Sequence, residues 1–284
     1  MIEVWFLIAV GLIAVIFASI QDLKKREVTN WISFSLIVFA LGFRFFYSLF
    51  SGESFQDLNF FYYGLIGLGI FLVIGHLFYY GRVFAGGDAK LMIALGTVLP
   101  LSNSFNENLN LFVMFLFLFL VVGGIYGILW SFVLVVKHWK NFAKEYKKQF
   151  ILYKKFMNSF FVSALLVIII GIVFDMLVLY LGVILFLLPV VYIYAKAIDE
   201  SCMVKKIKSS KLVEGDWIYN DIKIRRGVVV KAKWEGVSMK DILAIKKNKK
   251  FVLVREGIPF VPVFFFTFLI LVFMWFSGSV VGFF

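Results

Sequence analysis

The sequence predicts an all-α membrane protein with several spanning helices and one small cytoplasmic α+β module. The first observation is composition: 62% of the 284 residues are hydrophobic and only 16% are charged, a balance that water-soluble domains of this length do not show. The second is that apolar runs of about 20 residues, long enough to cross the hydrocarbon core of a bilayer, recur along the chain. The bilayer is therefore expected to be the solvent for most of the chain.

Eight apolar runs are predicted to be spanning helices. The fourth is short and contains Pro100, and the first is interpreted as a permanent helix because it begins with Glu3 in place of the basic start of a signal peptide. Pro259 is placed to begin the last helix, where its missing N–H costs nothing. The runs lie at residues 3–20, 31–50, 59–80, 89–101, 110–136, 157–174, 176–195 and 259–284.

The basic residues predict how these helices are oriented. The formal net charge is +12, and if the runs alternate across the membrane, 28 of the 29 lysines and arginines fall on one face, the exception being Arg44 in the second run. The positive-inside rule makes this face cytoplasmic and places both termini outside. A charge arranged in this way indicates contact with membrane lipids, and nucleic acid is not an expected partner.

Residues 197–256 break the apolar pattern and are predicted to form the cytoplasmic module. Polar and apolar residues alternate over 221–225 and again near 228–234, which is typical of strands. Ser238 is placed to cap a short helix, and 251–254 is predicted to be the last strand. The expected division of the chain is 1–196 for the transmembrane core, 197–256 for the module and 257–284 for a C-terminal transmembrane helix. A lysine and aromatic stretch at 137–156 resembles an interfacial amphipathic helix.

Two aspartates are the candidates for chemistry. Asp22 closes the first helix and Asp88 opens the fourth, both at the cytoplasmic boundary, where an ionisable group needs an explanation. Peptide hydrolysis by water can use such a pair, with one ionised carboxylate to accept a proton and one protonated carboxyl to polarise the carbonyl. Gly86 and Gly87 would let an extended substrate backbone approach Asp88. The alternative is that both are ordinary boundary charges at helix ends.

The two aspartates are expected to differ in role. The start of a helix favours negative charge at Asp88, whereas the end of a helix disfavours it at Asp22. On this argument Asp88 is the base. No metal or organic cofactor is expected, because Cys202 is the only cysteine and neither His76 nor His138 has a partner at ligand spacing.

The residues around both aspartates resemble two motifs of the prepilin peptidases. Asp22 is followed eight residues later by Asn30, which leads into a helix, as in their first aspartate motif. Gly86-Gly87-Asp88 is similar to the second motif, the Gly-x-Gly-Asp signature of membrane aspartic proteases, although Ala85 replaces its first glycine. The chain thus resembles the family of prepilin and archaeal preflagellin (class III signal) peptidases, and more its archaeal branch, because the four-cysteine zinc domain common in bacterial members is missing.

The resemblance implies an aspartic endopeptidase with a six-helix core and about two further helices. It would cut the short basic leader, which precedes a hydrophobic helix, from type IV pilin-like or archaellin precursors at the cytoplasmic face. No cofactor is implied. The implied catalytic residues are Asp22 and Asp88, and the implied supporting or substrate-binding residues are Gly86, Gly87, Lys24, Lys90 and Asn30.

Two other functions remain open at this point. A presenilin-like protease would cut inside transmembrane segments, but its Pro-Ala-Leu triplet is absent and Gln21 stands where its first motif has tyrosine. A proton-coupled transporter could use the same aspartates as a relay. Transporters usually show repeats or matched broken helices in two halves, and the sequence shows neither.

Overall fold

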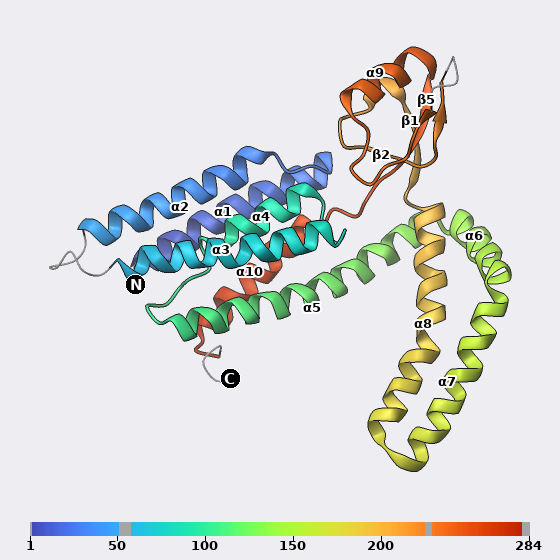
Figure 1. The fold of residues 1–284 in the computed structure, drawn as a ribbon, viewed down its shortest axis with the longest axis horizontal. Coiled ribbons are helices and arrows are strands. Elements are labelled where there is room, and N and C mark those ends of the chain that lie inside the picture. The colour runs from blue at the N-terminus through green and yellow to red at the C-terminus, as the bar shows by residue number, and fades with distance from the viewer. Residues whose placement is uncertain (1, 51–57, 225–228, 280–284) are drawn as a thin grey trace. The chain divides into compact units, whose positions relative to one another are not determined.

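The computed structural model describes residues 2–50, 58–224 and 229–279 (Figure 1). It divides into two compact units, of which the first combines residues 1–128 with 258–284 and the second is residues 129–257. The N-terminal part of the first unit ends at residue 128, whereas the transmembrane core was expected to extend to 196. The last helix, which was expected to be a separate segment, packs with the N-terminal helices and belongs to the same unit. The limits of the membrane core and the cytoplasmic module stay a prediction.

The predicted fold class is confirmed. Each of the eight apolar runs coincides largely with a helix, and six of these helices are long and apolar enough to cross a membrane. The six are α1 (Ile2–Lys25), α2 (Asn30–Phe50), α3 (Asn59–Tyr80), α5 (Phe105–Lys137), α7 (Lys154–Phe174) and α8 (Met176–Ser201).

The fourth and eighth runs form shorter helices than expected. Helix α4 (Gly86–Gly96) has 11 residues, which at 1.5 Å per residue is about 17 Å and does not cross a hydrocarbon core of about 30 Å. It ends before Pro100, which cannot continue a helix. Helix α10 (Val261–Phe276) starts after Pro259 and ends before Gly278, which has the left-handed φ of 72° common after helix ends. Residues 280–284 of the last run lie outside the described part.

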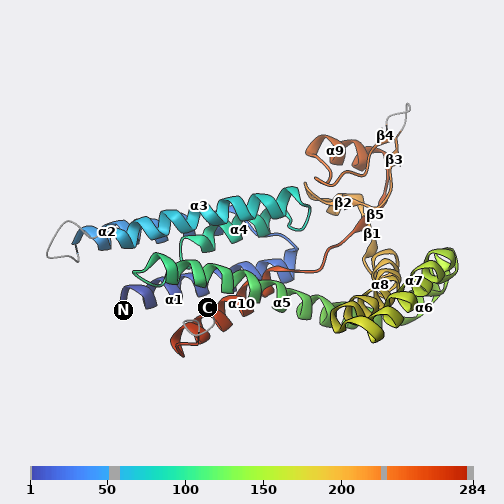
Figure 2. The ribbon, with the colours of Figure 1, turned by 60° about the horizontal axis from the view of Figure 1, so that its bottom comes forward.

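Glycines let α4 lie directly along α3 (Figures 1 and 2). A Cβ on Gly75 of α3 would lie 2.8 Å from Ile93 of α4, and a Cβ on Gly67 would lie 2.1 Å from the carbonyl oxygen of Gly96. Small residues of this kind allow helix backbones to approach closely in membranes. The contacts run in opposite order along the two helices, so α4 returns beside α3.

Arg44, a basic residue in the middle of the second predicted span, is fully buried in the first unit. Its guanidinium donates hydrogen bonds to four carbonyl oxygens, which belong to Phe60, Thr97, Val98 and Pro100. Three of these belong to the segment that follows α4, so Arg44 supplies hydrogen-bond donors to buried carbonyl groups just beyond the end of the short helix. This pairing explains how a buried charge is accommodated.

Helix α10 packs against both α1 and α5. A Cβ on Gly11 of α1 would lie 3.1 Å from the ring of Phe268 of α10, and the rings of Phe119 in α5 and Phe264 in α10 are 4.7 Å apart. Helix α10 therefore belongs to the core of the first unit, although it follows in sequence after the whole second unit.

The second unit contains the rest of α5, three further long helices and the small module. The helices are α6 (Trp139–Leu152), α7 and α8, and the predicted amphipathic stretch is thus helical. A three-stranded antiparallel sheet has the order β1-β5-β2, and β3 and β4 form a separate antiparallel pair. The remaining bounds are β1 (Val204–Lys208), a 3-10 helix (Ser209–Lys211), β2 (Trp217–Ile218), β3 (Ile222–Lys223), β4 (Val229–Val230), α9 (Met239–Asn248) and β5 (Phe251–Arg255).

The structure confirms most of the elements predicted for the module. Ser238 caps α9, where its hydroxyl accepts a hydrogen bond from the N–H of Asp241 at 3.3 Å, and β5 is the predicted last strand. Strand β3 lies within the first alternating segment, 221–225, and β4 lies within the second, 228–234. Residues 225 and 228 of these segments lie outside the described part. Strands β1 and β2 were not predicted.

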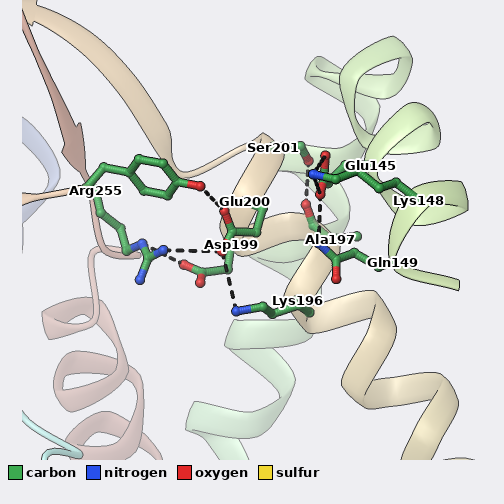
Figure 3. A network of polar contacts seen from close by, with 10 residues as sticks. Glu145, Lys148, Gln149, Lys196, Ala197, Asp199, Glu200, Ser201 and Arg255 are labelled. Carbon is green, nitrogen blue, oxygen red and sulfur yellow. Dashed lines mark hydrogen bonds and ion pairs between the residues drawn. The ribbon is translucent and has the colours of Figure 1, made fainter. Parts of the chain in front are cut away.

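A polar network ties the sheet to the end of α8 (Figure 3). Arg255, the last residue of β5, forms ion pairs with Asp199 at 3.1 Å and with Glu200 at 3.6 Å. Tyr219 donates its hydroxyl hydrogen to Glu200, and Lys196 lies 3.4 Å from the same carboxylate. Because both acids belong to the last turns of α8, these contacts fix the sheet to that helix.

Candidate active site

Asp22 lies in the last turns of α1 and is buried. The helix ends a few residues later because Arg26 adopts a left-handed φ of 60°, with its N–H bonded to the carbonyl oxygen of Asp22 at 2.9 Å. A left-handed residue is a common way to end a helix, although it is uncommon for a residue with a side chain. The chain thus turns immediately after the candidate acid.

The carboxylate of Asp22 accepts a hydrogen bond from the start of α10. The backbone N–H of Val261, the first residue of that helix, donates to Oδ2 of Asp22 at 2.9 Å, and the bond is buried. The first N–H groups of a helix have no partner within the helix and carry its positive end. Helix α10 therefore offers its N-terminus to one of the two aspartates.

Asp88 is the third residue of α4 and is half-buried. Its Oδ2 accepts a hydrogen bond from the backbone N–H of Ala85 at 3.3 Å, as an acid in the first turn of a helix often does. Gly86 and Gly87 begin the helix, and a Cβ on Gly87 would lie 3.3 Å from Val28. Ala85 replaces a glycine of the Gly-x-Gly-Asp signature, but its interaction with Asp88 uses only the backbone.

The structure brings the two aspartates into electrostatic interaction. Asp22 comes from the end of α1 and Asp88 from the start of α4, where Gly87 packs against Val28 of the α1–α2 turn, so the two acids lie within electrostatic reach of each other. Two carboxyl groups placed in this way disfavour double ionisation, so that a single proton is shared by the pair. This arrangement can supply one acid and one base to a single reaction.

Two supporting residues from the sequence analysis also meet. The Nζ of Lys90 donates to Oδ1 of Asn30 at 2.7 Å, which connects α4 to the first residue of α2. The turn between α1 and α2 is held by Gln21, whose side-chain oxygen accepts from the N–H and the hydroxyl of Thr29 at 3.2 and 2.9 Å. Lys24 is exposed on the last turn of α1.

Sequence reasoning missed two residues beside Asp22. One is Val261, for which the prolines around the start of the last helix were the only signal. The other is Tyr126 of α5, on whose hydroxyl the charge of Asp22 acts, and a lone tyrosine in an apolar run gives no signal at all. Among the described residues, no group of three or more histidines, cysteines or acids could hold a metal ion.

Comparison with known proteins identifies one family over the segment that holds both aspartates. Residues 9–128 match the type IV leader peptidase family. The chain is 31% identical over 94 residues to a preflagellin peptidase of Methanocaldococcus jannaschii, and 29% identical over 91 residues to one of Methanococcus maripaludis.

These alignments are partial. They cover 33% and 32% of this chain and 38% and 37% of the two relatives, so the chain spans little more than a third of the relatives that it matches. No solved structure matches the chain. The resemblance to the leader peptidase family that the two aspartate motifs indicate is thus confirmed over residues 9–128, which include most of α1, all of α2 to α4 and most of α5.

Proposed function

We propose that the chain is a membrane aspartic endopeptidase that removes the basic leader from type IV pilin-like or archaellin precursors. The observation that carries the proposal is that the end of α1, with Asp22, and the start of α4, with Asp88, converge through the Gly87–Val28 contact and the Lys90–Asn30 hydrogen bond, within the segment that matches the leader peptidase family. The matched relatives are preflagellin peptidases by name, which supports a precursor with an archaellin-type leader as the substrate.

The pair would act through a water molecule. The ionised carboxylate accepts a proton as the water oxygen attacks the scissile carbonyl, while the protonated carboxyl donates a hydrogen bond to the carbonyl oxygen. The tetrahedral intermediate then collapses, and one of the two acids delivers a proton to the leaving amine. Gly86 supports an extended substrate beside Asp88, since a Cβ there would meet only the ring of Tyr79, at 3.8 Å, whereas Gly87 packs against Val28.

The site is proposed to lie at the cytoplasmic face. In the described part of the chain, two helices of spanning length, α2 and α3, lie between Asp22 and Asp88, which supports placing both acids on one side of a membrane. Basic residues follow or flank both of them, and the positive-inside rule assigns such a boundary to the cytoplasm. These residues are Lys24, Lys25, Arg26, Arg82 and Lys90.

The test is cleavage of a co-expressed precursor that carries a class III signal. Asp22→Asn and Asp88→Asn are each expected to lower processing by at least about a thousandfold, because asparagine can neither take nor give the catalytic proton. Asp175→Asn is the matched control, since Asp175 caps α8 through the N–H of Leu177 and asparagine caps helices equally well. Full processing by either of the first two variants, with the control active, would contradict the proposal.

A further inference from the structure

We infer that the backbone N–H of Val261 is a positioning group of the active site and that it makes Asp22, and not Asp88, the base of the pair. This inference rests on the proposed function and adds to it a part of the chain outside the matched segment 9–128. The first unit is then catalytically complete only with α10, which follows the second unit in sequence.

The hydrogen bond itself is suited to a negative acceptor. Its length of 2.9 Å is within the range of charge-assisted bonds. Val261 is fully buried and Asp22 is only 7% exposed, so burial disfavours a charge on Asp22, and the N–H of Val261 offsets part of that cost in the place of water. The donor is also at the N-terminus of a 16-residue helix, whose positive end favours a carboxylate over a neutral carboxyl.

Asp88 has weaker support for a negative charge. The bond from Ala85 to its carboxyl is longer, at 3.3 Å, than the bond of 2.9 Å from Val261 to Asp22, and is therefore weaker. The repulsion between the two carboxylates is mutual, but the positive charge of Arg26 acts on Asp22 alone among the two acids. Of the two carboxyl groups, Asp88 is therefore the one that keeps the shared proton.

This assignment reverses the expectation from the sequence, for an identifiable reason. The end of α1 does disfavour negative charge at Asp22, but a second helix end lies at the same carboxylate, and the sequence does not indicate it. The start of α10 offsets the end of α1. Only the fold brings Val261 to Asp22, from 239 positions further along the chain.

An aromatic contact fixes the start of α10 relative to α4. The ring of Phe260, the residue before Val261, lies 6.3 Å from the ring of Phe84 and 5.7 Å from that of Phe119 in α5. Phe84 is almost fully buried and directly precedes Ala85, the donor to Asp88. The two backbone donors of the pair are thus held by one cluster of phenylalanines.

The test removes the donor and keeps the side chain in place as far as possible. Val261→Pro deletes the N–H at a helix start, where proline is tolerated. Because Phe260 has helical backbone angles (φ −101°, ψ −17°), which a following proline disfavours, a second variant carries the hydroxy-acid analogue of valine at 261, which replaces only the N–H by oxygen. Val261→Ala keeps the donor and is the control for lost packing.

Without the donor, kcat for precursor cleavage is expected to fall by about ten- to a hundredfold while KM changes little. The acid side of the pH–activity curve should move to higher pH, since Asp22 then needs a more alkaline solution to stay ionised. The charged or titratable groups that act on Asp22 are Arg26, Asp88 and Tyr126, and they are the same in every variant. Val261→Ala should keep the wild-type pH profile, whatever its rate.

A hydroxy-acid variant with the kcat and pH profile of the wild type would overturn the inference. This outcome differs from a failure of the proposed function, in which Asp22→Asn itself still cleaves the precursor. If Asp22→Asn is inactive and the hydroxy-acid variant is unaffected, the peptidase assignment is supported, but the proposed role of the N–H at the start of α10 is wrong.

Discussion

Arg44 in α2 donates through Nη2 to the carbonyl oxygen of Pro100 at 2.6 Å, across 56 positions of the sequence. The contact lies just after the end of α4, where the chain continues beside α3. Buried carbonyl groups need partners, and a guanidinium with five N–H groups can serve several at once. The short helix that carries Asp88 thus depends on a basic residue from another helix.

Replacing Arg44 should therefore destabilise the first unit. Arg44→Met keeps the apolar stem but leaves the buried carbonyl groups without donors, and we expect a loss of about 3 to 5 kcal/mol in the free energy of unfolding. Arg44→Lys should lie between this variant and the wild type, because an ammonium cannot reproduce the planar fork. Unfolding in detergent micelles measures both, with Arg82→Gln, an exposed basic residue, as the control.

Arg44 also shows what could be predicted from the sequence. Its position inside an apolar run made it an exception, but nothing in the sequence indicated the carbonyl groups that it binds. Asp22 and Asp88 could be found because an acid beside an apolar run is conspicuous and its side chain carries the chemistry. Val261 could not be found in this way, because it contributes a backbone N–H, which every residue except proline has. This N–H matters only because the fold places it next to the carboxylate of Asp22.

The close approach of α3 and α4 makes a second prediction. A Cβ on Gly67 would lie 2.1 Å from the carbonyl oxygen of Gly96, so Gly67→Ala must push α4 away from α3. We expect a loss of about 1 to 3 kcal/mol in the free energy of unfolding and a lower rate of cleavage, since α4 carries Asp88. Gly69→Ala is the matched control on the same helix, because a Cβ there meets nothing within 4 Å. Equal losses for both variants would contradict this explanation.

The network around Arg255 makes a third prediction, for the second unit. Arg255→Met leaves the carboxylates of Asp199 and Glu200 without their partner on β5. These groups are partly exposed, so the expected cost is only about 1 to 2 kcal/mol. Hydrogen exchange of the β5 amides should become faster, and that of the middle of α8 should not change. Lys208→Met, at the exposed end of β1, is the control and should leave both unchanged.

The cap of α9 makes a pH prediction. Hydrogen bonds from the hydroxyl and the N–H of Ser238 hold the pKa of Asp241 below its ordinary value of 3.8. The stabilisation that they provide is thus present above pH 3.8 and is lost as the pH falls through the lower pKa of the folded protein. Hydrogen exchange in the first turn of α9 should become faster relative to that of β5 over this acid range. Asp241→Asn, which does not titrate, should remove this pH dependence.

The last prediction concerns the binding of anionic lipid by helix α6. It carries four exposed lysines at positions 140, 144, 147 and 148 in a 14-residue helix. A lysine near an anionic membrane surface contributes about 1 kcal/mol, and salt screens this attraction. We expect the four Lys→Gln changes together to weaken the retention of anionic lipid in detergent-purified protein, measured by mass spectrometry, whereas the four Lys→Arg changes should preserve it. If the Gln variant retains as much anionic lipid as the wild type at low salt, these four lysines do not form the lipid contact.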